Sequence, residues 1–135
     1  MPLLNPNYVA GEDLYPARIV KRATDENNAV LMADDGTAAP VGVVFNGTRE
    51  APIPSVTTAY AALDGESVRV HGPGDVCEVE IGETLTDGCE VMAGTNGVAM
   101  VATAGNYVVG ICQRGVTYSS GEKAWIHIVI YQKNA

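Results

Sequence analysis

The sequence has little positive charge. Its 135 residues include 8 Lys and Arg against 16 Asp and Glu, which gives a formal net charge of −8. The basic cluster Arg18, Lys21 and Arg22 stands alone, and no Lys or Arg lies between Arg69 and Arg114. Nucleic acids and anionic membranes bind clustered basic side chains, so this composition argues against both as partners.

Long apolar runs and cysteine motifs are also missing. No run approaches the roughly 20 apolar residues that span a bilayer. Residues 1–16 lack the charged and continuously apolar regions of a signal peptide. Cys77, Cys89 and Cys112 are odd in number and have no CxxC or metal-ligand spacing. We therefore expect synthesis and folding in a reducing cytoplasm, and no metal site.

Groups that carry catalysis are few. Of the two histidines, His71 and His127, only His127 with Cys112 makes a conceivable nucleophilic pair. An activated cysteine needs an electropositive, partly exposed setting, and the valine-rich surroundings here predict the opposite. There is no glycine-rich phosphate loop and no nucleophile elbow. We predict that the chain is not an enzyme and holds no cofactor.

Short β-strands are what the composition favours instead. Valine and alanine are abundant, and 15 glycines divide the chain at short intervals. The expected strands are 17–24, 29–33, 40–46, 67–71, 76–81, 89–93, 98–102, 106–113 and 124–132. The sequence thus predicts an all-β fold, a small β-sandwich or a partly open β-barrel, with one domain over residues 17–135.

Two strands show which of their faces is buried. In 76–81, residues Cys77, Val79 and Ile81 alternate with two glutamates, which is typical of a strand with one wet face. In 124–132 both faces are largely apolar, so this strand is central or lies at a subunit interface. Its second face carries Trp125, His127, Val129 and Tyr131. We expect Trp125, His127 and Tyr131 to face the core or a sister subunit.

Residues 1–16 differ from the rest and are predicted to form an extended N-terminal arm. Three prolines interrupt any regular element, yet the segment is richer in apolar and aromatic side chains than a disordered tail. The arm either orders against a partner or folds back onto its own domain. For the first case the predicted contacts are Leu3, Leu4, Tyr8, Leu14 and Tyr15.

Two segments allow more than one interpretation. Residues 48–63 fit a loop with one helical turn or a short helix, with Ser55 as a candidate N-cap. Asp34 and Asp35 precede Gly36 without further oxygen ligands at EF-hand spacing, so a plain turn is favoured over a calcium loop.

Residues 29–44 and 98–112 resemble each other. Each region has a strand, a turn with glycine and then a Val-Gly-hydrophobic strand, at 41–44 and 109–112. One approximate pair supports two similar β units in one domain, and it does not indicate a solenoid, which needs at least three repeats.

The second half resembles the bacteriophage capsid cement, or head-decoration, protein family. The matching elements are Asp87-Gly88, Val91, Asn96-Gly97, Gly105, the Val-Val-Gly-Ile run at 108–111, and Gly121 before the last strand. The resemblance implies a structural protein on the outer surface of a virion, which binds across joints between major capsid subunits after the head expands. It also implies a homo-oligomer, either dimer or trimer.

The alternative function is a carbohydrate-binding or adhesion module on a virion surface. Such a module is also small, acidic and all-β, and it presents an exposed aromatic platform. The sequence offers six Tyr and one Trp for one.

Overall fold

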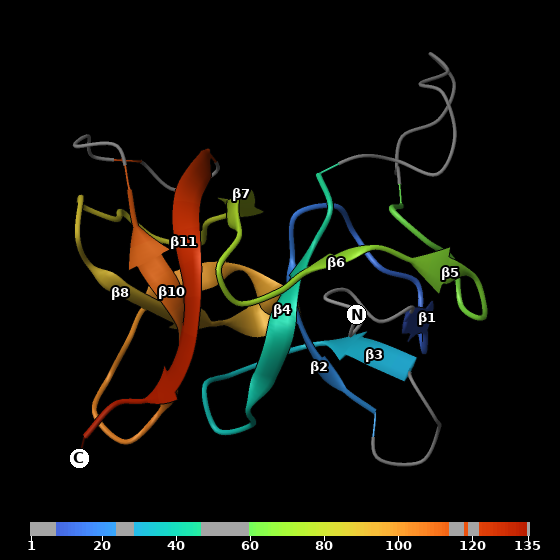
Figure 1. The fold of residues 1–135 in the computed structure, drawn as a ribbon, viewed down its shortest axis with the longest axis horizontal. Helices are drawn as coiled ribbons and strands as arrows, with labels where there is room; N and C mark the ends of the chain where they lie inside the picture. Colours follow the sequence, from blue (N-terminus) through green and yellow to red (C-terminus); the bar gives the residue numbers. More distant parts are fainter. Residues whose placement is uncertain (1–7, 24–28, 47–59, 114–117, 119–121, 135) are drawn as a thin grey trace.

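The fold consists of β-strands in two sheets (Figure 1). The computed structural model describes residues 8–23, 29–46, 60–113, 118 and 122–134. Within them the one helical element is the short 3₁₀ turn η1 (Thr95–Gly97), and no helix is long and apolar enough to cross a membrane. The predicted all-β class is confirmed.

The N-terminal sheet has the strand order β5-β1-β3-β2-β4-β6. All its pairs are antiparallel except β1 with β3. Its edge strands β5 and β6 are separated by Arg69 alone, so one run of chain pairs with β1 at its start and with β4 at its end. The sheet therefore curls back on itself. Its strands are β1 (Tyr8–Ala10), β2 (Ile19–Arg22), β3 (Ala29–Met32), β4 (Pro40–Val44), β5 (Ser67–Val68) and β6 (Val70–His71).

The C-terminal sheet has the order β7-β11-β10-β8-β9 and curls in the same way. Ile81, directly after β7, forms a parallel bridge with Ala99 in β9, so the end of the first edge strand meets the other edge. Its strands are β7 (Val76–Glu80), β8 (Glu90–Ala93), β9 (Ala99–Val101), β10 (Tyr107–Cys112) and β11 (Lys123–Gln132).

The two sheets repeat one pairing scheme. β2 lies between β3 and β4 as β8 lies between β9 and β10, all antiparallel. The registers also correspond: the pair Lys21–Leu31 matches Met92–Met100. Outside the strands, the bridge Leu14–Ala62 matches the bridge Leu85–Tyr118. The similarity of 29–44 to 98–112 is therefore confirmed as one part of a longer structural repeat.

A buried glycine occupies equivalent positions in β4 and β10. A Cβ atom at Gly42 would lie 1.9 Å from the carbonyl oxygen of His71, and one at Gly110 would lie 2.6 Å from that of His127. No side chain fits there, because real Cβ atoms keep well beyond 3 Å from a backbone oxygen. The Val-Gly motif thus lets the next strand approach closely in both halves.

A second repeated feature is a glutamate that binds a strand amide. Glu12 Oε2 accepts a hydrogen bond from Met32 N at 2.8 Å, and Glu83 Oε1 accepts one from Val101 N at 2.6 Å. Both glutamates lie in the short motif Gly-Glu-x-Leu, at 11–14 and 82–85. The repeat of this motif in the sequence is the signal that marks the two equivalent turns.

Neighbouring residues of β2 and β4 point into two different core clusters. Val20 and Val44 belong to a cluster inside the N-terminal sheet, while Ile19 and Val43 pack with the core of the C-terminal sheet. All four side chains are fully buried. The N-terminal sheet is thus covered on both faces here, and the second of these faces joins the two halves.

Candidate interaction surfaces

The described part of the predicted arm lies in the N-terminal half of the fold. Tyr8 begins β1, which pairs with both β3 and β5. Leu14 is fully buried in the core cluster of that half, and Tyr15 packs against its edge. Residues 8–16 therefore have the folded-back arrangement, in which Leu14 is a core residue. Leu3 and Leu4 lie outside the described residues.

Tyr15 takes part in a small aromatic group at the surface. Its ring stacks on Tyr60, with centroids 5.1 Å apart, and the guanidinium carbon of Arg18 lies 4.9 Å from the Tyr15 centroid. Arg18 also donates to the carbonyl oxygen of Asn96, 3.0 Å away, in the C-terminal half. Both rings are half-buried, and each contacts other side chains of the chain.

The outer face of β11 carries the predicted interface residues. Ile126 and Ile128 point into the core and are fully buried, whereas Trp125 and His127 on the other face are partly exposed. Val129 and Tyr131 on the same face are 36% and 37% exposed. Strand alternation thus directs Trp125, His127 and Tyr131 away from the core.

β7 extends this surface. Val76 is 49% exposed and pairs with His127, while Cys77 and Val79 point inward and are buried, as the sequence predicts. Sequence reasoning missed Val76 as a surface residue, although its alternation with Glu78 and Glu80 placed it on the wet face. We call Val76, Trp125, His127, Val129 and Tyr131 the β11 face.

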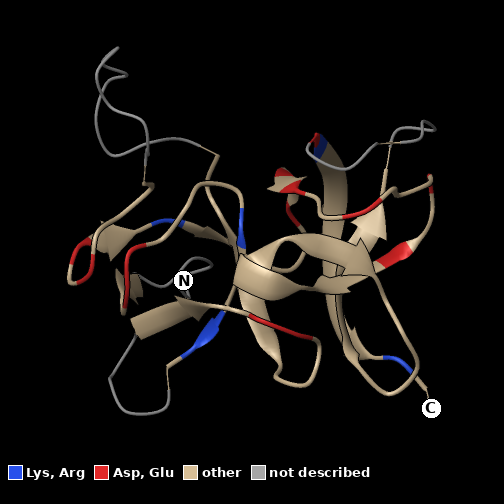
Figure 2. Ribbon diagram, turned by 180° about the vertical axis from the view of Figure 1, so that it is seen from behind, with Lys and Arg blue, Asp and Glu red and all other residues tan. Residues whose placement is uncertain are grey.

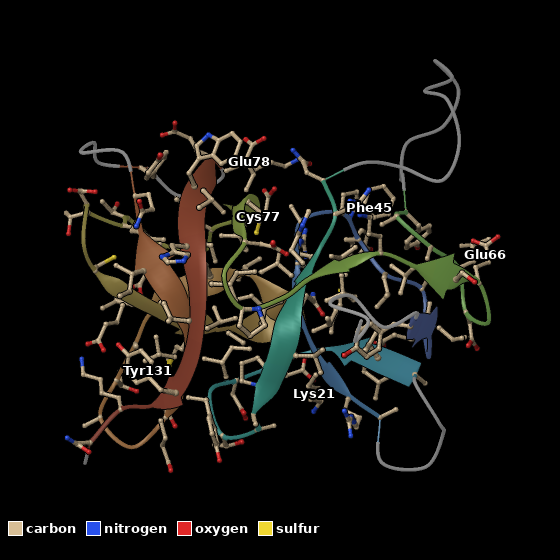
Figure 3. The ribbon with its side chains drawn as sticks, viewed as in Figure 1. Lys21, Phe45, Glu66, Cys77, Glu78 and Tyr131 are labelled. Carbon is tan, nitrogen blue, oxygen red and sulfur yellow. The ribbon has the colours of Figure 1, made fainter. Side chains whose placement is uncertain are left out.

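Charged groups border the β11 face at both ends. At one end Tyr131 donates a hydrogen bond to Glu90, and Lys133 forms an ion pair with Glu90 at 3.1 Å. The bond from Tyr131 and then that from Lys133 lower the pKa of Glu90, and the bond to Glu90 raises the pKa of Tyr131 to about 12. Figure 3 shows Tyr131 and Glu78 at opposite ends of β11.

At the other end, side chains from both halves meet. Lys123 donates to the side-chain oxygen of Asn46, whose amide nitrogen donates to Glu78 at 3.1 Å. Acidic positions are spread over both halves, and basic ones are few (Figure 2). The β11 face is therefore an apolar stripe within a mainly acidic surface.

Cys77 and Cys112 do not have the setting of a catalytic nucleophile. Burial raises the pKa of Cys77 to about 12 and that of Cys112 to about 11. Cys112 pairs with Ile126 and is buried, while His127 pairs with Ile111 on the opposite face of the sheet, so the register separates Cys112 from His127. Among the described residues, no three His, Cys, Asp or Glu side chains are placed to hold a metal ion.

The structure decides between the two interpretations of Asp34–Gly36. Asp35 accepts hydrogen bonds from the amide of Thr37 at 2.9 Å and from its hydroxyl at 2.6 Å, which forms a turn closed by its own side chain. These bonds lower the pKa of Asp35. The candidate helix at 48–63, including Ser55, lies mostly outside the described residues.

The fold is similar to that of one solved virion protein. The crystal structure of the head fiber gp8.5 N base of bacteriophage phi29 superposes with a TM-score of 0.63 at 15% sequence identity, covering 93% of each chain. No family model and no curated protein sequence matches the chain. At this identity the comparison shows a shared fold.

Proposed function

We propose that this chain is a structural protein of a bacteriophage virion. The observation that carries the proposal is the fold, which the chain shares over nearly its whole length with the base of a phage head fiber. The resemblance of residues 65–132 to capsid cement proteins points to the same class independently. Catalytic function has no support in the described residues, where the buried thiols are held protonated.

Within that class, we propose that the protein binds the outer surface of the expanded head and stabilises joints between major capsid subunits. Binding to the expanded shell alone stabilises that shell by mass action, and many copies together add to the effect. Co-sedimentation with expanded and unexpanded heads tests this function. Saturable binding to expanded heads is expected, and binding to neither form would overturn it.

The β11 face is the surface we propose for contact with the capsid or with a sister subunit in a dimer or trimer. Exposed apolar side chains beside an acidic rim are typical of protein interfaces. Val129→Glu should abolish binding or oligomerisation, because it places a charge in the centre of the stripe. Val101→Glu is the matched control, since Val101 is 41% exposed on the edge strand β9, away from the β11 face.

For the arm, we propose that Leu3 and Leu4 contact the capsid, together with the exposed parts of Tyr8 and Tyr15. Leu14 leaves this set because it is buried in the core. Deleting residues 2–7 removes the two leucines and leaves β1 complete, so it separates binding from folding. Unchanged affinity for expanded heads in this variant would overturn the role of the arm.

A further inference from the structure

Cys89 and Cys112 face each other across two neighbouring strands. Cys89 directly precedes β8, and Cys112 ends β10. The amide of Cys112 donates to the carbonyl oxygen of Cys89 at 2.9 Å, and the amide of Gly88 donates to that of Cys112 at 2.9 Å. Next to the antiparallel pair Ile111–Glu90, these two bonds and the positive φ of Gly88 form a β-bulge, in which Gly88 and Cys89 together oppose Cys112.

The two thiols also lie on the same side of the sheet. Cys112 belongs to the core cluster of the C-terminal half, and the partly buried Cys89 packs against that cluster. After burial, the charge of Cys89 and a hydrogen bond with its thiol are the largest causes that raise the pKa of Cys112. Directly opposed antiparallel residues have Cα atoms about 4.5–5.5 Å apart, within the range of about 4.4–6.8 Å that disulfides span.

The structural repeat shows that the backbone pairing at Cys89 and Cys112 does not require cysteine. In the N-terminal half the equivalent positions hold Arg18 and Val44, and the same 2.9 Å hydrogen bond joins their backbones. The C-terminal half therefore has cysteine at both of these paired positions, whereas the N-terminal half has cysteine at neither. Cys77 differs, because its pKa is raised by burial, Asp75 and Glu78 without a contribution from another thiol.

We propose that Cys89 and Cys112 are a redox modification site, which forms an intramolecular disulfide when the folded protein meets a low-molecular-weight disulfide such as oxidised glutathione. The partly exposed Cys89 thiolate attacks the reagent, forming a mixed disulfide and releasing one glutathione thiol. Cys112 then loses its proton and attacks Cys89 Sγ, which releases the second glutathione. Two protein thiols are oxidised and one glutathione disulfide is reduced to two thiols.

The bond would join the beginning of β8 to the end of β10, and so tie together two strands of the C-terminal sheet. The thiol chemistry does not depend on the proposed function. Its benefit would be greatest for a protein that folds in a reducing cytoplasm and then works outside the cell, where disulfides persist.

The experiment incubates the folded full-length protein with oxidised glutathione, blocks the remaining thiols with an alkylating reagent, and maps the peptides by mass spectrometry. We expect a Cys89–Cys112 cross-link with Cys77 alkylated after unfolding. The cross-linking rate should rise with pH, because thiolate is the attacking species. Cys77→Ala should keep the cross-link, and Cys89→Ser should prevent it.

Several results would overturn the proposal. They are a mixed glutathione disulfide that stays on Cys89, a cross-link between two chains, and three thiols that remain free. The stability of the oxidised protein shows whether the native backbone accommodates the disulfide or is distorted by it. In urea, the oxidised protein should unfold at a higher concentration than the reduced one, and a lower midpoint would mean that the native strands do not accommodate the bond.

Discussion

At the scale of single residues, the repeat explains an unusual backbone conformation. Ala17 has φ of 56°, in the left-handed region that glycine favours. Its equivalent in the C-terminal half is Gly88, with φ of 82°. Ala17 and Gly88 each end a turn. The turn follows a leucine that forms an isolated β-bridge, Leu14 in the first case and Leu85 in the second. The turn needs this conformation, and the N-terminal half adopts it with a fully buried alanine.

Gly88→Ala should lower the free energy of unfolding by about 1–2 kcal/mol, the usual penalty for a side chain in the left-handed region. The added methyl meets no atom within 4 Å, so the penalty is purely conformational. Gly72→Ala is the matched control: it is equally uncrowded and lacks a positive φ. Urea unfolding measures both variants, and equal stabilities would contradict the assignment.

The bond between Tyr131 and Glu90 predicts a pH dependence. The pKa of Tyr131 is raised from 10.0 to about 12, so its stabilisation is complete below pH 10 and is lost as the pH rises through about 12. The pKa of Glu90 is lowered from 4.5, so its stabilisation is present above that value and is lost as the pH falls. Tyr131→Phe should weaken both dependences.

Ultraviolet titration of tyrosinate provides the measurement. The wild-type titration should include a component near pH 12 from Tyr131, and Tyr131→Phe should lack that component. A wild-type titration curve without that late component would show that the bond does not form in solution.

At the scale of elements, alternation predicted most of the strands and their faces. It placed Cys77, Val79 and Ile81 of 76–81 inward, and all three are buried. The curling of the sheets could not be predicted from the sequence. The bridge between Ile81 and Ala99 joins two segments that no local sequence pattern connects. Residues 8–10 were expected in an arm because nearby prolines suggested irregular chain, yet pairing to both β3 and β5 makes them a strand.

The repeated glutamate bond is testable at this scale. Removing the acceptor with Glu83→Ala leaves the amide of Val101 without its bond and should lower stability by about 1–2 kcal/mol. Glu12→Ala should have a similar effect through Met32, and the double variant should be additive because the two sites are separate. Stability equal to wild type in urea unfolding would show that water replaces these carboxylates.

At the scale of the whole molecule, the two halves share their interior. Ile19, Ala33 and Val43 come from the N-terminal half and lie in the core cluster of the C-terminal half. Further links cross the same boundary: Glu80 N donates to the carbonyl oxygen of Ala17 at 2.8 Å, and Tyr107 N to that of Gly36 at 2.8 Å. We therefore expect the two copies of the β unit to unfold together, as one cooperative domain.

Cooperativity between the halves gives the last prediction. Trp125, the single tryptophan, reports on the C-terminal half, while far-ultraviolet circular dichroism reports on all strands. The two signals should follow one urea transition. Val43→Ala should shift it to lower urea by removing about 2 kcal/mol, because the lost methyl groups leave a cavity between the halves.

Val44→Ala is the matched comparison, since Val44 is equally buried but points into the N-terminal core. In a single cooperative domain it must move the Trp125 fluorescence transition by as much as the circular dichroism transition. A fluorescence midpoint unchanged in Val44→Ala would mean that the C-terminal half unfolds independently. The molecule would then consist of two domains in series.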